Sequence, residues 1–180
     1  MALTSLFRRN PHRTAAHTAY VSIVEQARAP EFFLQLDVPD TLDGRFEMIA
    51  VHMFLVLNRL KVDHEQTSDF AQALFDAMFA DLDRALREMG ASDMSVGKRV
   101  KDMAKGFYGR IKAYEEGLAG DDQVFADALR RNLYGTVKPR PEAVAAMAHY
   151  MRSQAAALAR QLTDDILANN FKFDPITILL

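Results

Sequence analysis

The side chains that most often carry catalysis or hold a metal are few in this sequence, and their spacing fits neither role. The chain has 0 cysteines, so a thiolate nucleophile and a cysteine-bound metal are both excluded. No two of its 5 histidines have the i, i+4 spacing, with an intervening glutamate, that places two zinc ligands on one helix face. The Glu-x-x-His pairs of a di-iron helical bundle are absent too. We therefore expect no catalytic residue, no metal site and no cofactor, and we predict that the protein is not an enzyme.

Two pairs of adjacent aspartates, at positions 121–122 and 164–165, are the remaining candidates for a metal site. Similar pairs bind divalent metal in helical prenyl-transferring enzymes, where a further acid follows one helical turn later. Positions 124–125 and 168–169 hold no acid, so the motif is incomplete. We expect the first pair at a helix N-terminus, where an acid interacts favourably with the helix dipole, and the second on a solvated helix face. A metal-dependent helical enzyme is an alternative that rests on these pairs alone.

The clearest chemical pattern is a cluster of positive charge in residues 95–112, "SVGKRVKDMAKGFYGRIK", where six cations accompany a single acid, Asp102. Apolar residues recur there at spacings of three and four, which predicts a helix with one face packed in the core. These inward positions are Val96, Val100, Met103, Phe107 and Ile111. The lysines share a second face, which we call the lysine stripe. It consists of Lys98, Lys101, Lys105 and Lys112, with Arg99 and Arg110 on an adjoining line.

Gly106 and Gly109 interrupt this helix, although glycine in a helix interior is less favourable than alanine by about 1 kcal/mol. We infer that another backbone comes close there and that the adjacent aromatic side chains help to hold an apolar segment or a partner helix. The candidate partner-binding surface comprises Lys98, Arg99, Lys101, Lys105, Gly106, Phe107, Tyr108, Gly109, Arg110 and Lys112. Four interpretations are open: a solvated face that aids solubility, or a site for RNA phosphates, acidic loops of a protein or anionic lipid headgroups.

The elements that position this segment are predicted to be helices. With 180 residues, 49% of them hydrophobic and 26% charged, the chain is long enough for one domain with its own core. Apolar residues follow the helical period almost throughout, so we predict an all-α, single-domain bundle of about six helices with an extended C-terminal tail. The expected helices are one ended by Pro30, one from 41 or 43 to 61, one from 66 to 89 followed by Gly90, one capped by Ser95, one from 121 or 122 to 135, and one from 141 to 168.

Two features of this bundle carry further expectations. The second helix is apolar nearly all round, which is typical of a central helix, and His52 on it is expected to be a hydrogen-bonded histidine of the core or of a groove. The tail, residues 171–180, alternates apolar side chains around Pro175. We favour a tail that covers a groove of the bundle over the alternative, a segment that occupies a site until a client displaces it.

The overall charge and the N-terminal residues limit how the protein could meet a charged partner. The 22 Lys and Arg nearly balance the 24 Asp and Glu, giving a net charge of -2, so attraction to nucleic acid or membrane has to come from a local patch. The most apolar run, Met48–Leu57, is far shorter than the ~20 residues that span a bilayer. Residues 1–13 carry three arginines and no acid, and they are predicted to be a basic tail before a helical domain at 14–180. An organellar transit peptide and an interfacial anchor are the alternatives for this tail.

The sequence contains three linked segments, at residues 95–115, 38–60 and 75–90. Together they resemble the ubiquinol-cytochrome c chaperone family, the assembly factors for cytochrome b of respiratory complex III. The first comprises residues 95–115, "SVGKRVKDMAKGFYGRIKAYE". The second comprises residues 38–60, "VPDTLDGRFEMIAVHMFLVLNRL", in which an Asp-Gly-Arg-Phe turn leads into an apolar helix. The third comprises residues 75–90, "FDAMFADLDRALREMG". The resemblance runs from about residue 20 to about residue 118, and a linked set of this kind is more specific than a single short motif.

The resemblance implies a non-catalytic assembly chaperone that binds newly synthesised cytochrome b, nascent or newly inserted, and supports assembly of the ubiquinol-cytochrome c reductase complex. It further implies contact with the ribosome, through RNA or protein, a small partner subunit, peripheral contact with anionic membrane, and no small-molecule substrate. The sequence has no long N-terminal extension of the mitochondrial kind. We therefore expect a bacterial-type member in the cytoplasm, peripheral to the inner membrane, or on the mitochondrial matrix side if it is eukaryotic. A general RNA-binding or membrane-peripheral helical module is the alternative, and it requires binding that weakens steeply with salt.

The Asp-Gly-Arg-Phe turn of the second segment also has a physical interpretation. Its residues are Asp43, Gly44, Arg45 and Phe46. We interpret them as a structural turn at the start of the central helix. Arg45 is then available to form an ion pair with an acid of the next helix, such as Asp81 or Asp83.

Overall fold

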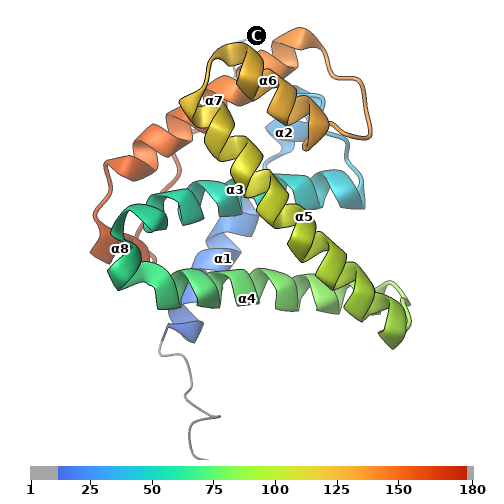
Figure 1. Ribbon diagram of the computed structural model, residues 1–180, viewed down its shortest axis with the longest axis vertical. Helices are drawn as coiled ribbons and strands as arrows, with labels where there is room; N and C mark the ends of the chain where they lie inside the picture. Colours follow the sequence, from blue (N-terminus) through green and yellow to red (C-terminus); the bar gives the residue numbers. More distant parts are fainter. Residues whose placement is uncertain (1–11, 178–180) are drawn as a thin grey trace, which may run out of the picture.

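The computed structural model describes residues 12–177, and over that range the chain forms helices joined by short connections (Figure 1). The helical elements are α1 (Arg13–Ala27), α2 (Pro30–Leu34), α3 (Leu42–Leu60), the 3-10 turn η1 (Lys61–Asp63), α4 (His64–Glu88), α5 (Asp93–Ala119), α6 (Asp122–Arg131), α7 (Pro141–Ala159) and α8 (Thr163–Leu167). Six of these helices have ten residues or more, which confirms the predicted all-α bundle. Arg13, assigned above to the basic tail, is the first residue of α1, and residues 1–11 of that tail lie outside the described residues. None of the described helices is both long and apolar enough to cross a membrane.

Helix α3 is the centre of the bundle, as its apolar sequence predicts. Thr41 precedes it, and the Thr41 side-chain oxygen accepts a hydrogen bond from Gly44 N at 3.2 Å, which satisfies a donor of the first turn. Twelve residues of α3 are buried, and the helix packs against α1, α4, α5 and α7. Helix α5 crosses in front of α3 and α4 in Figure 1 and leads to α6. Because α3 is enclosed in this way, its two buried polar residues, Glu47 and His52, must find partners inside the protein.

His52 is a fully buried core histidine that connects two helices, which confirms its prediction. Its Nδ1 lies 2.8 Å from the Met48 carbonyl oxygen, which can only accept, so this nitrogen carries the proton. Its Nε2 therefore accepts the hydrogen bond of the Tyr150 hydroxyl of α7, at 2.8 Å. The Tyr150 oxygen accepts in turn from the Gln26 amide of α1, at 3.1 Å. A neutral imidazole thus links α3 to α7 and, through Tyr150, to α1.

Acid is expected to destabilise this fold through His52. Burial lowers the pKa of His52 to about 4 from an ordinary value of 6.5. Between these two values the unfolded chain binds a proton that the folded chain does not, so stability is lost as the pH falls below the unfolded pKa. From pH 7 to pH 5 we expect this residue to lower the free energy of unfolding by about 2 kcal/mol. Urea unfolding at both pH values measures the loss, and an equal loss in a His52→Gln variant would contradict the assignment.

The last long helix ends earlier than predicted. The sequence predicts one helix from 141 to 168, whereas α7 ends well before that point and α8 follows after a short break. Arg59, at the end of α3, occupies the break. Its guanidinium donates to the carbonyl oxygens of Leu158 and Gln161 at 3.2 and 3.0 Å, and to the Thr163 hydroxyl at 2.9 Å. The carbonyls that end α7 thus find a partner 99 positions away from Leu158 in the sequence, which no local pattern indicates.

Two other helix boundaries differ from the predicted ones by a few residues. Helix α5 begins at Asp93, with Ser92 rather than Ser95 at the N-cap position. Helix α6 ends before the predicted Gly135, because the chain turns back and buries Tyr134. The Tyr134 hydroxyl donates to a backbone carbonyl of the connection between α2 and α3 at 2.8 Å. Tertiary contacts, rather than capping residues, therefore determine this second boundary.

The C-terminal tail is extended and forms no strand within the described residues. Phe171 is buried, and Phe173 and Ile176 are half-buried against the core. The tail therefore covers part of the bundle, as predicted. The apolar residues at 178–180, which belong to the same predicted pattern, lie outside the described residues.

Candidate functional site

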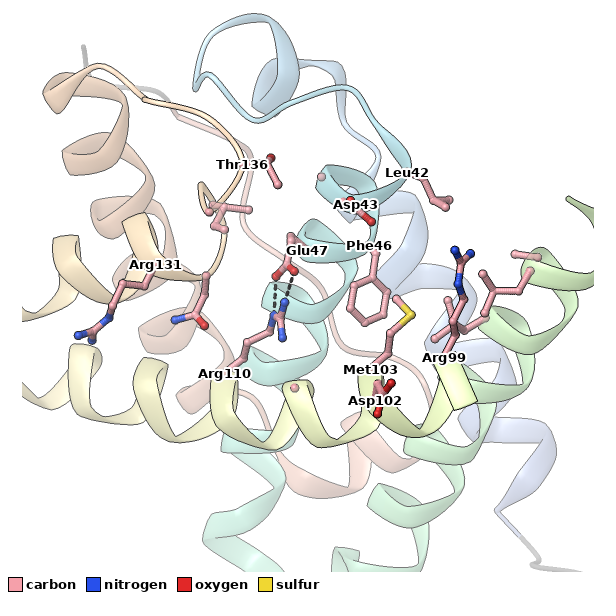
Figure 2. A pocket seen from close by; sticks show the side chains of 18 of the residues that line it. Leu42, Asp43, Phe46, Glu47, Arg99, Asp102, Met103, Arg110, Arg131 and Thr136 are labelled. Atoms are coloured by element: carbon pink, nitrogen blue, oxygen red, sulfur yellow. Dashed lines mark hydrogen bonds and ion pairs between the residues drawn. The ribbon is translucent and has the colours of Figure 1, made fainter. Parts of the chain in front are cut away.

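A groove of about 620 Å³ opens between the start of α3, the end of α4, the middle of α5 and the loop from α6 to α7 (Figure 2). We call it the α3–α5 groove. Two segments that the sequence singled out independently, the Asp-Gly-Arg-Phe turn and the basic helix α5, both line it. Leu82, Leu86 and Met89 of the third segment line it too, so the groove brings together all three segments on which the family resemblance rests.

The Asp-Gly-Arg-Phe turn reaches the groove because α3 starts there. Asp43 and Phe46 lie about one helical turn apart, and both line the groove (Figure 2). Gly44, between them, packs against the backbone of the preceding connection. An added Cβ atom at Gly44 would overlap the Pro39 carbonyl oxygen. The turn therefore requires glycine at this position for a close approach of two backbone segments.

Arg45 does not make the predicted ion pair with Asp81 or Asp83. It pairs instead with Asp40, five residues earlier, with 2.6 Å between Arg45 Nε and Asp40 Oδ1. Asp81 and Asp83 pair with arginines about one turn further along α4. Residues three or four positions apart on a helix are neighbours, so Asp81 and Asp83 form ion pairs with these arginines rather than with the more distant Arg45.

The polar centre of the groove is an ion pair between Glu47 of α3 and Arg110 of α5. Arg110 donates from Nε to Glu47 Oε2 at 2.6 Å and from a terminal nitrogen to Oε1, so the contact is bidentate (Figure 2). Burial raises the pKa of Glu47, and the hydrogen bonds from Arg110 oppose this rise. The hydrogen bond to Glu47 raises the pKa of Arg110. Both carboxylate oxygens are occupied, so Glu47 holds α5 against α3 and is not free to act as a general base.

A buried phenol accompanies this ion pair. Tyr114 of α5 is fully buried, its ring packs against Phe54 of α3 at 5.4 Å, and burial raises the pKa of its hydroxyl, with Glu47 adding to the rise. Among the described residues its hydroxyl has no hydrogen-bond partner. A buried hydroxyl without a partner is uncommon, so the interior next to the groove retains unused capacity for a hydrogen bond.

The rest of the groove combines apolar walls with a charged rim. The apolar side chains come mainly from α4 and its C-cap, with smaller contributions from α3 and α5, and they include Leu82, Leu86, Met89 and Met103. Arg99, Asp102 and Arg131 contribute charges of both signs, and Figure 2 shows Arg99 and Arg131 on opposite sides of the Glu47–Arg110 pair. Leu42 and Met89 are 51% and 54% exposed at the rim. Such a groove suits an apolar segment with polar flanks. Within residues 12–177 no group of three or more His, Cys, Asp or Glu side chains could hold a metal ion.

The lysine stripe lies on the outward face of α5, away from the groove. Lys98, Lys101, Lys105 and Lys112 are all exposed. Over the part of the chain that the structure describes, one ion pair involves the stripe, between Lys112 Nζ and Glu116 Oε1 at 3.9 Å. The stripe is therefore a largely unneutralised patch of positive charge that a partner could reach.

Two members of the predicted partner-binding surface belong to the interior. Phe107 is fully buried against two phenylalanines of α4, so its assignment to an exposed surface was wrong, although its inward spacing was correct. Arg110 is engaged with Glu47. Tyr108 is the exposed aromatic of the segment, 61% accessible, with its ring 5.5 Å from that of Phe75. Because the Phe107 side chain is packed in the core, Tyr108 is the aromatic residue of the predicted surface that can still contact a partner.

The glycines of α5 do not mark the approach of a second backbone among the described residues. An added Cβ atom at Gly109 would meet nothing within 4 Å, and one at Gly106 would lie 2.8 Å from Arg110 Nη1. Gly106 therefore leaves room for the Arg110 guanidinium on its way to Glu47. Gly109 is exposed and can meet a partner outside this chain.

Both aspartate pairs lie at the starts of helices. Asp121 caps α6, with its Oδ1 accepting from Val124 N at 2.9 Å, and Asp122 pairs with Arg152 at 2.5 Å. Asp164 and Asp165 are exposed in the first turn of α8. The predicted role at a helix N-terminus is confirmed for the first pair. The second pair is solvated as predicted, and it also faces a helix N-terminus because α8 is separate from α7.

Glu47 is the groove residue that the sequence reasoning missed. It lies in an otherwise apolar run of α3, where it is buried. A carboxylate in the inward pattern of a central helix is a signal, because such a group needs a buried cation. The cation, Arg110, is 63 positions away, and the sequence could not identify it among the other arginines.

Comparisons with known proteins agree with the resemblance noted in the sequence. A sequence model of the family described as ubiquinol-cytochrome C chaperone matches residues 34–173. The chain is 28% identical over 155 residues to the ubiquinol-cytochrome-c reductase complex assembly factor 1 of Xenopus laevis, covering 86% of this chain and 78% of the relative. The human protein of the same description is also 28% identical, over 86% of this chain and 52% of its own length. This chain thus spans about half the length of the human relative.

Two further comparisons are with proteins whose descriptions name Cbp3. The chain is 28% identical over 151 residues to Protein CBP3, mitochondrial, of Saccharomyces cerevisiae, covering 82% of this chain and 45% of the yeast protein. The crystal structure of the Cbp3 homolog from Brucella abortus superposes with a TM-score of 0.81 and 34% identity, covering 94% of both chains. The likeness of fold therefore extends over nearly the whole chain.

Proposed function

The chain belongs to the ubiquinol-cytochrome c chaperone family, and from this premise we propose that it is a non-catalytic assembly chaperone of the ubiquinol-cytochrome c reductase complex, complex III, that binds newly synthesised cytochrome b. The proposal combines family membership with one structural observation. The Asp-Gly-Arg-Phe turn and helix α5 line the same groove, although they are far apart in the sequence. We propose that this groove holds an apolar segment of the client.

The shape and chemistry of the groove support this role. Its apolar walls can shield a hydrophobic segment from water, and its rim carries cations and anions that can pair with the polar flanks of that segment. The Glu47–Arg110 pair fixes the distance between α3 and α5, so the groove is formed before a client arrives. Binding to a groove of this kind needs no reacting group, which is consistent with a protein that protects a client and does not modify it.

We propose a separate role for the lysine stripe and for Tyr108 and Gly109 beside it. These residues are exposed on the outward face of α5, so they can contact a negatively charged surface while a client occupies the groove. The ribosome and the anionic headgroups of a membrane both offer such a surface. We propose that this contact occurs on the cytoplasmic side of the inner membrane, or on the matrix side in a mitochondrion, with a small partner subunit as a further candidate.

Charging the rim of the groove is expected to abolish client capture. We propose a Leu42→Glu, Met89→Glu variant, because both side chains are exposed at the rim and their replacement should change the free energy of unfolding by less than about 1 kcal/mol in total. Two charges against an apolar client should reduce the recovered cytochrome b at least about tenfold. Affinity capture of the tagged full chain from its own cells, read by mass spectrometry, measures this.

The matched control places the same charges on apolar residues outside the groove. Val62 and Leu162 are 75% and 70% exposed, and neither lines it, so a Val62→Glu, Leu162→Glu variant is expected to capture as well as the unmodified chain. A Lys98→Glu, Lys105→Glu variant in the same experiment tests the lysine stripe. This variant should reduce the recovery of ribosomes or lipid. Equal loss in the rim and control variants would exclude the groove. RNA or lipid recovered without cytochrome b by the unmodified chain would favour a general RNA-binding or membrane-peripheral module.

A further inference from the structure

Two glutamines, Gln154 of α7 and Gln161 just after its end, hold the C-terminal tail by its backbone. Gln161 donates from Nε2 to the Lys172 carbonyl at 2.7 Å and accepts from Lys172 N at 2.9 Å. Gln154 repeats this arrangement on Asp174, at 3.1 and 2.9 Å. Each amide group thus pairs with both backbone groups of one residue, as a neighbouring strand would. Gln154 lies within α7, and Gln161 lies two residues beyond its end, in the break before α8.

These hydrogen bonds go to backbone groups, so they do not depend on the side chains of Lys172 and Asp174. Lys172 is exposed, and the Asp174 carboxylate pairs with an exposed arginine, Arg160, at 3.4 Å. Gln154 is 1% exposed, so its polar amide is buried for this contact. A buried amide without a partner would be costly, and a backbone segment at this position satisfies it whatever its sequence.

The aromatic side chains that alternate with the paired residues along the tail provide the selectivity. Phe171 is buried, and the Phe173 ring packs edge-on against His52 at 5.2 Å and against Phe171 at 5.8 Å. In an extended segment alternate side chains point to the same face, so residues 171 and 173 point inward while 172 and 174 point outward. The site therefore selects aromatic residues at alternate positions and contacts the other residues through their backbone alone.

The tail does not fill the whole site. A cavity of about 230 Å³ continues along α7 next to the end of the tail and is lined by Ser153 and Gln154 on one side and by Pro175 and Thr177 on the other. The tail is joined to α8 through residues 168–170, with Asn169 in the left-handed conformation at φ 59°. Ile166 of α8 is fully buried. The tail can thus leave its site while α7 and α8 stay in place.

From these contacts we infer that α7 and the residues directly after it carry a peptide-binding site for an extended segment of a partner protein with aromatic residues at alternate positions, and that residues 171–177 occupy this site in the free protein. The tail supplies the pattern that a partner has to match: two inward aromatics and a backbone that pairs with Gln154 and Gln161. Because the tail is tethered, it competes at an effective concentration on the order of millimolar. The site is distinct from the α3–α5 groove and does not depend on the client proposed for it.

Releasing the tail within the full chain is expected to open the site to a peptide. The probe is a fluorescein-labelled synthetic peptide of residues 169–177, NNFKFDPIT, and fluorescence anisotropy measures its binding. A full-length Phe171→Ala, Phe173→Ala variant should bind this peptide at least about tenfold more tightly than the unmodified chain, whose own tail competes. Adding Gln161→Ala to that variant should weaken binding again.

Peptide variants distinguish the proposed recognition from nonspecific adhesion. A peptide with alanine at both phenylalanine positions should not bind, and one with alanine in place of Lys172 and Asp174 should bind within about twofold of the original, since only backbone is read there. Equal binding of the peptide to the variant and the unmodified chain would overturn the inference. So would tail-exchanged dimers of the unmodified chain in sedimentation velocity, because the occupant would then be a second copy.

Amide hydrogen exchange on the unmodified chain provides a measurement that does not depend on the folding of a variant. If the tail leaves its site while the bundle stays folded, the amides of Lys172 and Asp174 should exchange at least about a hundredfold faster than the core amides of α3. Exchange of these amides only at the rate of α3 would mean that the tail leaves only on global unfolding, and the site would not be open to a partner.

Discussion

Replacing Arg110 with alanine is expected to lower the free energy of unfolding by about 3 kcal/mol. The Arg110 and Glu47 side chains are 21% and 10% exposed, so neither charge is well hydrated when its partner is missing. Without the guanidinium, the Glu47 carboxylate loses two hydrogen bonds. Burial then raises the pKa of Glu47 further, because no hydrogen bond from Arg110 lowers it. The expected loss is therefore the cost of an unpaired buried acid, more than the value of one contact.

Arg45→Ala is the matched control for this substitution. Arg45 also pairs with an acid, Asp40, but the two side chains are 59% and 58% exposed, so its removal should leave the free energy of unfolding nearly unchanged. Urea unfolding followed by circular dichroism measures both variants. A Glu47→Leu, Arg110→Met variant should regain most of the loss, because replacing both partners leaves no buried charge. Similar losses for the two arginines would show that the Glu47–Arg110 pair is hydrated in solution.

The double replacement also separates the folding role of the pair from its role in the groove. Glu47 and Arg110 both line the groove, so the apolar variant keeps the contact between α3 and α5 but changes the polarity of the groove floor. If the ion pair serves only to position the two helices, this variant should capture client normally. If the client makes a polar contact with the pair, capture should fall while stability is retained.

Much of the fold followed from local patterns in the sequence. The three-and-four spacing on α5 correctly indicated that Val96 and Phe107 face the core. The helix around residues 66–89 was expected to end before Gly90, whose φ of 83° confirms the left-handed conformation that favours glycine after a helix. These features depend on residues within a few positions of one another, which is why the sequence was sufficient to predict them.

The site could be predicted only in part, because its decisive contacts are long-range. The sequence identified both walls of the groove but not that they meet, since the contact runs through Glu47 and Arg110, 63 positions apart. The end of α7 depends in the same way on Arg59. Phe107 was assigned to the core by its spacing and to the surface by its neighbours in the sequence, and only the packing shows which assignment holds.

The second large effect is expected from the substitution of Gly44 by alanine, which should lower the free energy of unfolding by about 3 kcal/mol. The added methyl group would overlap the Pro39 carbonyl oxygen, a backbone atom that no change of rotamer can move. That oxygen also accepts a hydrogen bond from Thr41 N at 2.8 Å, so the turn before α3 is already tightly closed. Relief would require the whole connection to shift, together with the groove wall that follows it.

Gly109→Ala is the matched control, because the substitution is the same and its surroundings are empty. Among the described residues, and apart from the backbone of α5 itself and the two neighbouring residues, no atom lies within 4 Å of the added Cβ. Because α5 also gains a better helix former, stability should rise by up to about 1 kcal/mol. Thermal and urea unfolding of the two variants should therefore shift in opposite directions. A destabilised Gly109→Ala variant would contradict the open surface that the structure places there.

Client capture by these two variants distinguishes a glycine needed for folding from one needed for a partner. Gly44→Ala should lose capture in proportion to its loss of folded protein, since the groove forms only with α3 in place. Gly109→Ala stays folded, so any loss of capture would mean that a partner backbone approaches α5 there, as the paired glycines of the sequence predict. Full capture by the stabilised Gly109→Ala variant would restrict client recognition to the groove and leave the outward face of α5 to its lysines.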